Sequence, residues 1–495
     1  MSLVFKEGLL IDSSLLDIFT NEEINLIING LKKFNLKYIN LEVIEKNRLN
    51  ILEYLCNLNI EKSFIEKFKN KIGLNNYLAK EFLDKELIEE KEIQEEEEKI
   101  IFFQPIKKEI TVDDFVYFYR DRFNYLKEIL KGRKELDNLI SIDKLPKSNR
   151  NVSVIGMVYE KRETKNKNIL LTLEDNKASV AVLVNKDKDV YKKAINVVED
   201  EVIGVKGFGN REIIFASDIF FPEIINQNQK KCQDDKNIIF ISDIHVGSEK
   251  FLEKNFMRFV KWVNGDINND GKAKKISHIF ILGDLVDGVG IYPTQENELS
   301  IKDIKEQYKY LAEILKEIRQ DIKLVLLPGN HDAANLLEPQ SFTSHAKPLI
   351  FNNTELLQNP CFYEVYGYKL LLYHGYSLDY YANYVDGIKQ HKPYQNPRYL
   401  LRFFLSKRHL APSHGSTFYY PSQRDFLLID KIPDLFITAH IHKSDVDIFK
   451  NIILISTSCW QARTKFQEKV GHEPDPCKVI IFNTKNKKIN ILDFS

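Results

Sequence analysis

The chain has 495 residues, and its 71 Lys and Arg residues balance its 71 Asp and Glu residues, so the formal net charge is zero. At roughly 100–200 residues per domain, this length predicts about three domains. A hydrophobic content of 43% with 12% aromatic residues excludes a chain that is disordered throughout. Zero net charge does not favour a protein that holds polyanions by bulk electrostatics alone.

The cysteines and the apolar runs exclude further classes. Five cysteines occur without CxxC spacing, which argues against a disulfide framework and indicates a reducing compartment. The first residues, MSLVFKEGLLIDSS, lack a basic segment followed by an apolar one, so no signal peptide is expected. No apolar run approaches the roughly 18–20 residues that span a bilayer. The sequence therefore predicts a cytoplasmic protein without a membrane partner.

Two segments precede the folded regions that carry the recognisable motifs. Residues 1–80 have apolar side chains at helical spacing and are expected to form a small N-terminal helical domain. Residues 81–110 are expected to form an acidic linker, because the run DKELIEEKEIQEEEEK holds nine acids and three lysines. Such charge runs are usually solvated helices or tethers.

Residues 111–230 are predicted to form a helix, from Asp113 to Leu130, and then five short strands between Asn151 and Ser217. A helical piece near Val190–Val198 separates the third strand from the fourth. This β-β-β-α-β-β order is typical of the small Greek-key barrel called the OB-fold. Such barrels bind single strands or dock proteins, and the few aromatic residues on these strands favour docking or a combined role.

Residues 236–495 alternate apolar strands with helical stretches, which is typical of an α/β domain. Polar residues directly follow the strands NIIFIS, HIFIL, KLVLL, KLLLY and DLFIT. The carboxyl ends of strands in an open α/β sheet face one crevice, so these segments are expected to converge on one site. The residues concerned are Asp243, His245, Asp284, Asn330, His331, Asp332, His374, His440 and His442.

Their joint occurrence, and not any single motif, indicates a metal site. A DxH or HxH pair arises often by chance, and a lone histidine is more often structural than a ligand. Here all the motifs occur in order, each at a strand end. The GNHD segment is the most specific, because Gly329 would permit a tight turn that aims Asn330 and His331 into a cleft.

The donor types narrow the choice of metal. Carboxylates, imidazoles and one amide oxygen, without a thiolate, suit Mn, Fe or Zn. Seven candidate ligands exceed what one ion needs but suit two ions, held roughly 3.5–4 Å apart as in two-metal phosphoester hydrolysis. A water bound between two such ions loses a proton near neutral pH and becomes the nucleophile.

The ordered motifs DxH, GD, GNH, H and GHxH resemble the calcineurin-like metallophosphoesterase superfamily. The last motif is AHIH here, with Ala439 in place of the usual glycine. The resemblance implies a metallophosphoesterase β-sandwich flanked by helices. It also implies two ligand sets, which are Asp243, His245 and His442 for one ion, Asn330, His374 and His440 for the other, and Asp284 as the bridge.

The same resemblance implies that His331 binds no metal. It would stabilise the transition state or protonate the leaving oxygen, with Asp332 as its orienting partner. Protein phosphatases of this superfamily carry GDxxDRG, whereas this chain has GDLVDGVG, so the arginine that grips a phosphate monoester is missing. The pattern is therefore more similar to the nuclease branch.

The whole layout resembles the small subunit of archaeal D-family DNA polymerase. The segments RHLAPSHG from Arg408 and WQARTKFQEKVGHEPDPCKV from Trp460 are typical of that family, and the resemblance covers residues 105–495. Eukaryotic B-subunits share the OB-fold and phosphoesterase domains but have lost metal ligands. This sequence retains all seven, so the resemblance implies a catalytically competent subunit.

The resemblance then implies a 3′–5′ exonuclease that proofreads for a replicative polymerase. Its expected cofactors are two divalent ions, Mn²⁺ first, with Fe or Zn as alternatives. Its expected partners are a large catalytic subunit, in a heterodimer or heterotetramer, DNA with a 3′ end, and a sliding clamp reached through the complex. Three alternatives stay open: a free-standing repair nuclease of the double-strand-break type, a non-catalytic bridging subunit, and a phosphomonoesterase or small-molecule phosphodiesterase.

Other residues near the motifs have two interpretations each. Three histidines would either line a DNA channel or take surface or packing roles; they are His409, His414 and His472. Three arginines would either contact phosphates or lie at a partner interface; they are Arg402, Arg408 and Arg463. Tyr419 and Tyr420 would either stack a frayed 3′ base or pack in the interior. Asp287 is expected behind the metal ligands and not among them.

Overall fold

The computed structural model describes residues 2–5, 9–12, 15, 19–31, 38–39, 43–44, 51, 109–224, 230–267, 271–469 and 471–495. The chain divides into two compact units, residues 1–99 and 100–495. The acidic linker predicted over 81–110 lies outside the described residues, apart from 109 and 110. No helix within the described ranges is both long enough and apolar enough to cross a membrane.

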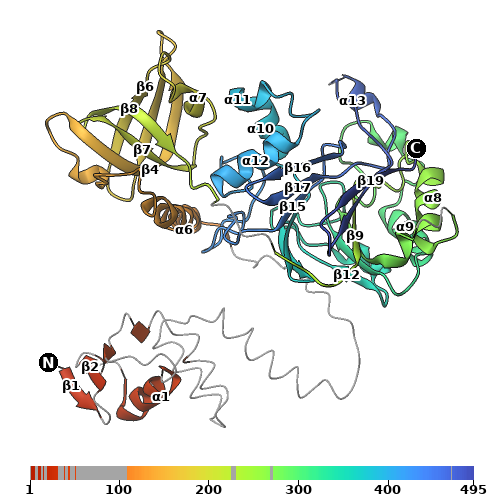
Figure 1. Cartoon of the computed structure of the whole chain (residues 1–495). Helices are drawn as coiled ribbons and strands as arrows, with labels where there is room; N and C mark the ends of the chain where they lie inside the picture. Colours follow the sequence, from red (N-terminus) through yellow and green to blue (C-terminus); the bar gives the residue numbers. More distant parts are fainter. Residues whose placement is uncertain are drawn as a thin grey trace. The chain divides into compact units, whose positions relative to one another are not determined.

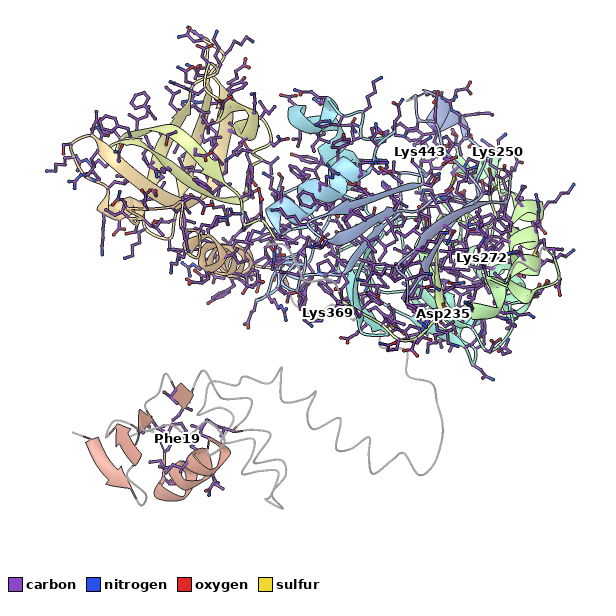
Figure 2. The ribbon with its side chains drawn as sticks, in the orientation of Figure 1. Phe19, Asp235, Lys250, Lys272, Lys369 and Lys443 are labelled. Atoms are coloured by element: carbon purple, nitrogen blue, oxygen red, sulfur yellow. The ribbon has the colours of Figure 1, made fainter. Side chains whose placement is uncertain are left out.

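The first unit contains strands as well as a helix. It has a three-stranded sheet in the order β1-β2-β3, and Phe19 is among its buried side chains (Figure 2). The predicted helical spacing is confirmed at α1. The prediction of a purely helical domain over 1–80 missed the strands, because short apolar runs such as LVF and LLI carry no period that separates a strand from a helix. The elements are β1 (Ser2–Phe5), β2 (Leu9–Asp12), α1 (Asn21–Leu31) and β3 (Tyr38–Ile39).

The second unit begins with a long helix and a closed barrel (Figure 1). The barrel strands pair in the order β4-β5-β6-β8-β7, and the barrel closes because β4 also pairs with β7. The order of five strands with one helix after the third agrees with the prediction. The elements are α6 (Val112–Lys131), η3 (Ile142–Lys144), β4 (Arg150–Glu163), β5 (Ile169–Glu174), β6 (Ser179–Val184), α7 (Tyr191–Ala194), β7 (Val202–Gly209) and β8 (Ile213–Phe220).

Two mixed sheets form the remainder of this unit. The first has the order β12-β11-β10-β9-β18-β19, and its strands β9 to β12 are parallel. The second has the order β13-β14-β15-β17-β16, in which β14, β15 and β17 are parallel. The strands are β9 (Asn237–Ile241), β10 (Ile276–Leu282), β11 (Lys323–Leu327), β12 (Thr354–Leu356), β13 (Cys361–Val365), β14 (Tyr368–Tyr373), β15 (Leu435–Thr438), β16 (Asp445–Phe449), β17 (Ile452–Ser456), β18 (Lys478–Asn483) and β19 (Ile489–Asp493).

The sheets pack face to face because their parallel strands are apolar on both sides. Phe240 of β9 packs between the sheets with Leu372 and Ile437 of the second sheet. The alternate residue Ile239 points the other way, into a core with helices α8 and α9. Helices α10 to α12 cover the outer face of the second sheet. The helices are α8 (Glu253–Asn264), η4 (Ala273–Lys275), η5 (Gln295–Glu298), α9 (Ile304–Lys316), η6 (Ser344–Leu349), α10 (Leu378–Tyr384), α11 (Asp386–Lys389), α12 (Arg398–Lys407) and α13 (Lys465–Lys469).

Buried ion pairs join α6 and the barrel to the two-sheet domain. Arg122 of α6 lies with its Nε 2.7 Å from Asp425 Oδ2, and both side chains are fully buried. His409 Nε2 lies 2.8 Å from the same oxygen. In a second pair, Lys407 Nζ lies 2.7 Å from Glu201 Oε2, beside the barrel. These buried ion pairs fix the position of the domains relative to each other, because separating the partners would leave a buried charge uncompensated.

Removing the guanidinium at this joint is expected to be costly. Arg122→Ala leaves Asp425 buried beside His409 alone, and this change should lower the free energy of unfolding by about 3–5 kcal/mol. Arg120→Ala, on the exposed side of the same helix, is the matched control and should change it by less than about 0.5 kcal/mol. Urea unfolding followed by circular dichroism measures both, and equal losses would contradict a special role for Arg122.

The joint also makes stability depend on pH. Burial and the neighbouring Arg122 lower the pKa of His409 to about 4. Between about pH 6.5 and about pH 4, His409 carries a proton in the unfolded chain but not in the folded chain. The free energy of unfolding should therefore fall as the pH falls through this range. Urea midpoints at pH 7.5 and 5.0 should differ less for His409→Gln than for the wild type. A pH slope that His409→Gln leaves unchanged would assign the acid sensitivity to other groups.

Candidate metal centre

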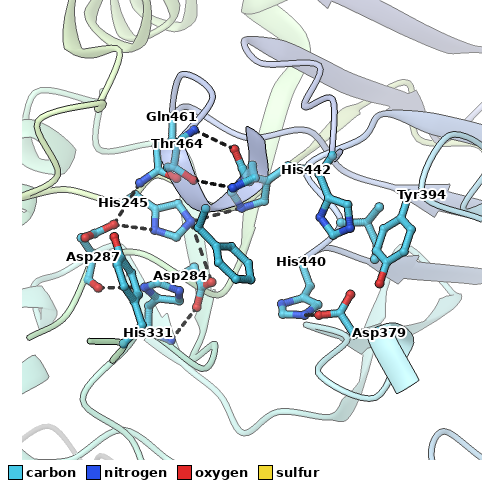
Figure 3. Close-up of a pocket in the computed structure, with 15 residues that line it drawn as sticks. His245, Asp284, Asp287, His331, Asp379, Tyr394, His440, His442, Gln461 and Thr464 are labelled. Carbon is cyan, nitrogen blue, oxygen red and sulfur yellow. Dashed lines mark hydrogen bonds and ion pairs between the residues drawn. The ribbon is translucent and has the colours of Figure 1, made fainter. Parts of the chain in front are cut away.

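The predicted ligands lie together where both sheets present the carboxyl ends of their parallel strands. Those of the first sheet follow β9, β10 and β11, and those of the second follow β14 and β15. Figure 3 shows His245, Asp284, His440 and His442 around one cavity, with His331 beside Asp284. The cavity measures about 170 Å³. The convergence expected from the strand pattern is thus present across two sheets and not along a single one.

One group of ligand atoms comes from Asp243, His245 and His442, which lie within 4.8 Å of one another. The Nε2 atoms of His245 and His442 are 3.2 Å apart, and His442 Nε2 is 3.3 Å from Asp243 Oδ1. Asp243 Oδ1 is buried and accepts no hydrogen bond. A buried carboxylate oxygen without a donor is costly unless a cation lies beside it. This group therefore fits a divalent cation.

A second group comes from Asp284, His374 and His440, again within 4.8 Å of one another. Asn330 Oδ1 lies 3.0 Å from His374 Nε2 and adds an amide oxygen. Asp284 Oδ2 lies 3.4 Å from His374 Nε2 and 3.8 Å from His245 Nε2, so this carboxylate faces both groups. Its position fits the bridging role that the resemblance implied.

Three of the imidazoles are oriented by oxygen atoms behind them. His245 Nδ1 lies 3.1 Å from Asp287 Oδ1, and His374 Nδ1 donates to the Leu282 carbonyl at 2.8 Å. His440 Nε2 lies 3.1 Å from Asp379 Oδ2. Such partners fix which nitrogen is left for a metal. Asp287 was expected in this place, whereas Asp379, at the start of α10, carries no sequence signal beyond its closeness to His374.

The charges of the site depend on one another. Burial opposes ionisation of Asp284, but His374 and His331 nevertheless hold the pKa of this carboxyl well below its usual range. Burial likewise opposes protonation of His374, but Asp284 and Asp243 raise its pKa to about 9. Without a cation beside it, His374 would thus hold a proton between these carboxylates. A bound cation would take the place of this proton.

Five of the ligand residues have left-handed backbone conformations. Their φ angles lie between 48° and 69°, a region that residues other than glycine rarely adopt. Such conformations cost on the order of 1–3 kcal/mol each and persist only where the surrounding structure imposes them. They are Asp243, His245, Asp284, His440 and His442.

Gly329 is required for a reason that differs from the one predicted. It does not have a positive φ angle. A Cβ at this position would instead lie 2.3 Å from Asp284 Oδ1 and 2.5 Å from the Asp284 nitrogen. Gly329 thus lets the loop after β11 approach the bridging carboxylate.

Asp332 does not orient His331, which corrects the earlier expectation. Its carboxylate accepts hydrogen bonds from Gly329 N at 2.8 Å and from the Tyr308 hydroxyl at 3.1 Å. His331 Nδ1 instead lies 2.8 Å from the carbonyl oxygen of Asp287. Asp332 points back into the domain and ties the loops after β10 and β11 together, since Leu285 N also donates to it.

Arg408, His409 and Tyr419 lie on the side of α6, and none of the three lines the cavity. Arg408 is buried and donates to the Tyr125 hydroxyl and the Asp430 carbonyl. Tyr419 stacks on Phe118 of α6 with ring centroids 4.7 Å apart. For His409 and Tyr419 the packing interpretation therefore holds, whereas Arg408 is buried within the chain itself. Of the other residues considered, His472 lines the cavity.

Comparison with known proteins agrees with this geometry. The calcineurin-like phosphoesterase family matches residues 236–444. The chain is 37% identical over 392 residues to the DNA polymerase II small subunit of Methanothermobacter thermautotrophicus, covering 78% of this chain and 80% of that protein. It is 34% identical over 447 residues to the subunit of Archaeoglobus fulgidus, covering 87% and 88%. The chain belongs to the DNA polymerase II small subunit family.

Membership of this family confirms the resemblance inferred from the motifs. A relative from Pyrococcus abyssi, 34% identical over 400 residues, is longer, and the match covers 64% of it and 78% of this chain.

The phosphoesterase match ends at residue 444. Residues of the metal cavity beyond that point, such as Gln461 and Gln467, come from the last part of the chain.

The close approach at Gly329 gives a test of the metal centre. Gly329→Ala should weaken Mn²⁺ binding by roughly 100-fold, because the added methyl group displaces Asp284 by about an ångström. Gly132→Ala, whose Cβ would be 3.4 Å from its nearest neighbour, is the control. Isothermal titration with Mn²⁺ measures binding, and circular dichroism shows whether each variant is folded. Mn²⁺ affinity unchanged in Gly329→Ala would remove Asp284 from the ligand set.

Proposed function

We propose that this chain is a metal-dependent 3′–5′ DNA exonuclease that proofreads as the small subunit of a D-family replicative DNA polymerase. The observation that carries the proposal is the Asp284 carboxylate, which faces two separate groups of ligand atoms. A shared carboxylate with additional ligands on each side suits two ions a few ångströms apart. All seven predicted ligands contribute to this arrangement.

Charge and geometry together indicate which residues would hold the two ions. Asp243, His245 and His442 would hold one ion, and Asp243 Oδ1 would gain the cation that its burial demands. Asn330, His374 and His440 would hold the other, with Asp284 shared. Two such ions would activate a water molecule and neutralise charge on a phosphodiester. Mn²⁺ is the first candidate, because the donors are oxygen and imidazole nitrogen.

His331 has the position of a proton donor. Its backbone N–H donates to Asp284 Oδ1 at 2.8 Å, which fixes the residue beside the bridging carboxylate. Its Nδ1 lies 2.8 Å from the Asp287 carbonyl oxygen and must carry a proton to donate to it. Nε2 is then the nitrogen left to act in the cavity that His331 lines. With a proton on Nε2 as well, the imidazolium would donate that proton to the leaving 3′ oxygen and remain as the neutral imidazole.

The surroundings of His331 favour a phosphodiester over a phosphate monoester. Gly288 stands where phosphatases of the superfamily carry their arginine. A Cβ at Gly288 would lie 2.3 Å from the His331 carbonyl oxygen, so no side chain fits there. No arginine is among the described residues that line the cavity, so its wall offers no bidentate guanidinium to a doubly charged phosphate.

A large polymerising subunit is the proposed partner. The relatives are named small subunits of DNA polymerase II. For this chain, the barrel and the outer face of the phosphoesterase domain are the proposed docking surfaces. DNA with a 3′ end would reach the cavity within that complex, and a sliding clamp would be contacted through it.

The function is tested with a primer–template that has a 3′ mismatch and a label at its 5′ end. With Mn²⁺ the wild-type chain should shorten the labelled strand from its 3′ end. His331→Ala should lower the rate by roughly 10²–10⁴-fold, because the leaving oxygen loses its proton donor. His391→Ala, an exposed histidine stacked on Tyr399, is the matched control and should retain the wild-type rate.

Metal removal and the large subunit complete the test. A chelator should abolish shortening, and added Mn²⁺ should restore it. No shortening by the wild type, with or without the large subunit, would contradict the proposal and favour a bridging subunit. Fast turnover of a small phosphate ester without cleavage of DNA would favour a small-molecule phosphoesterase.

A further inference from the structure

Beside the metal cavity lies a group of aromatic rings that the mechanism above does not use. Tyr394, Phe466 and His472 line the metal cavity and also a second cavity of about 380 Å³. Asp379 lines both cavities as well, so the two spaces adjoin. We refer to these three rings as the aromatic shelf. Figure 3 shows Tyr394 next to Asp379 and His440.

The shelf is built onto a metal ligand through Asp379. The Asp379 carboxylate lies 3.1 Å from His440 Nε2. Burial and this nearby carboxylate raise the pKa of the Tyr394 hydroxyl. Asn383 Nδ2 donates to the same hydroxyl at 2.9 Å. The His472 ring lies on the Tyr394 ring with centroids 3.9 Å apart. A ligand that packs against these rings is therefore held at a fixed distance from His440.

Phe466 supplies an exposed aromatic face at the same place. It belongs to α13 and is 59% exposed, although it lines both cavities. The next residue, Gln467, lies with its Nε2 3.0 Å from His442 Nδ1, so α13 is anchored to the other HxH histidine. His472 N donates to the Gln467 carbonyl at 2.8 Å. An exposed phenyl ring over an anchored segment next to a catalytic cavity points to a planar apolar ligand.

We infer that the aromatic shelf binds the terminal nucleobase of an unpaired 3′ end. The inference rests on the proposed nuclease function and names the form of its substrate. Every base has a face that can stack on an aromatic ring, so such a shelf accepts any base. A base that is paired within a duplex is already stacked and cannot enter, so the shelf selects ends that have separated from the template. Lys392, which also lines the second cavity, provides a positive charge for the adjoining backbone.

The shelf replaces the stacking residues considered from the sequence. Tyr419 is engaged with Phe118, and its hydroxyl lies 3.0 Å from that of Tyr119 of α6. It is therefore part of the domain joint. Tyr394 and His472, by contrast, border the cavity that holds His331.

Base stacking is measured with a single strand that carries 2-aminopurine at its 3′ end, because stacking quenches the fluorescence of this base. His331→Ala is used as the background with Mn²⁺ so that the strand is not consumed. Binding should quench terminal 2-aminopurine more strongly than 2-aminopurine placed ten nucleotides inside the strand. Adding Phe466→Ala or Tyr394→Ala should remove that difference and weaken binding by roughly tenfold, since a stacked base contributes about 1–3 kcal/mol.

Conservative variants and a distant aromatic residue serve as controls. Phe466→Trp keeps a stacking face and should retain the quench. Tyr117→Ala removes an aromatic side chain on α6 that is 52% exposed, and it should behave as the background. If Phe466→Ala and Tyr394→Ala also behave as Tyr117→Ala does, or if internal and terminal labels quench equally, the inference is overturned.

A second measurement separates this inference from the proposed function. With His331 intact, strands that end in a normal or an abasic nucleotide are compared for shortening. Faster removal of the normal nucleotide, with the difference lost in Phe466→Ala, supports the shelf. Equal removal of both ends overturns the shelf but leaves the nuclease standing. Terminal quenching without any shortening by the wild-type complex supports the shelf as a binding site and overturns the nuclease.

Discussion

The burial of two carboxylates at one sheet edge is the constraint on which the rest of the second unit depends. Asp243 and Asp284 are almost completely inaccessible to water, and an isolated buried carboxylate is strongly disfavoured. The imidazoles around them, His374 above all, supply compensating charge. Asp243 Oδ1 lies 3.3 Å from His442 Nε2 but accepts no hydrogen bond. The structure therefore holds a charge arrangement that fits bound cations.

The two-sheet architecture makes this arrangement possible. Ligands come from strands of both sheets, and the dry core between the sheets holds the strand ends in place. Without this packing, the left-handed backbone at five ligand residues would relax toward commoner conformations. The glycine at position 329 lets one loop close over Asp284, and Asp332 ties that loop to its neighbour. The positions of the site residues thus depend on packing in the core between the sheets and in the loops behind the site.

The contacts of α6 explain a family segment that has no ligand in it. RHLAPSHG, which begins at Arg408, is typical of the polymerase subunits, and contact with DNA was one of two interpretations of its Arg408 and His409. In the structure Arg408 and His409 face α6 and its Arg122–Asp425 pair. This segment fixes the barrel side of the unit against the phosphoesterase domain. Buried ion pairs constrain its sequence, because replacing one partner leaves the charge of the other uncompensated.

The sequence by itself determined the candidate ligands, the order of strands and helix along the barrel segment, and the superfamily, because these are local: each candidate ligand follows an apolar strand, and each strand has its own period. Residues that act through space carried no such signal. Asp379, which orients His440, and the rings of Tyr394, Phe466 and His472 come from separate loops without a shared motif. The role of Asp332 was mistaken because adjacency to His331 in the chain says nothing about where a side chain points. Only tertiary packing decides which loops meet, since their contacts join positions far apart in the sequence.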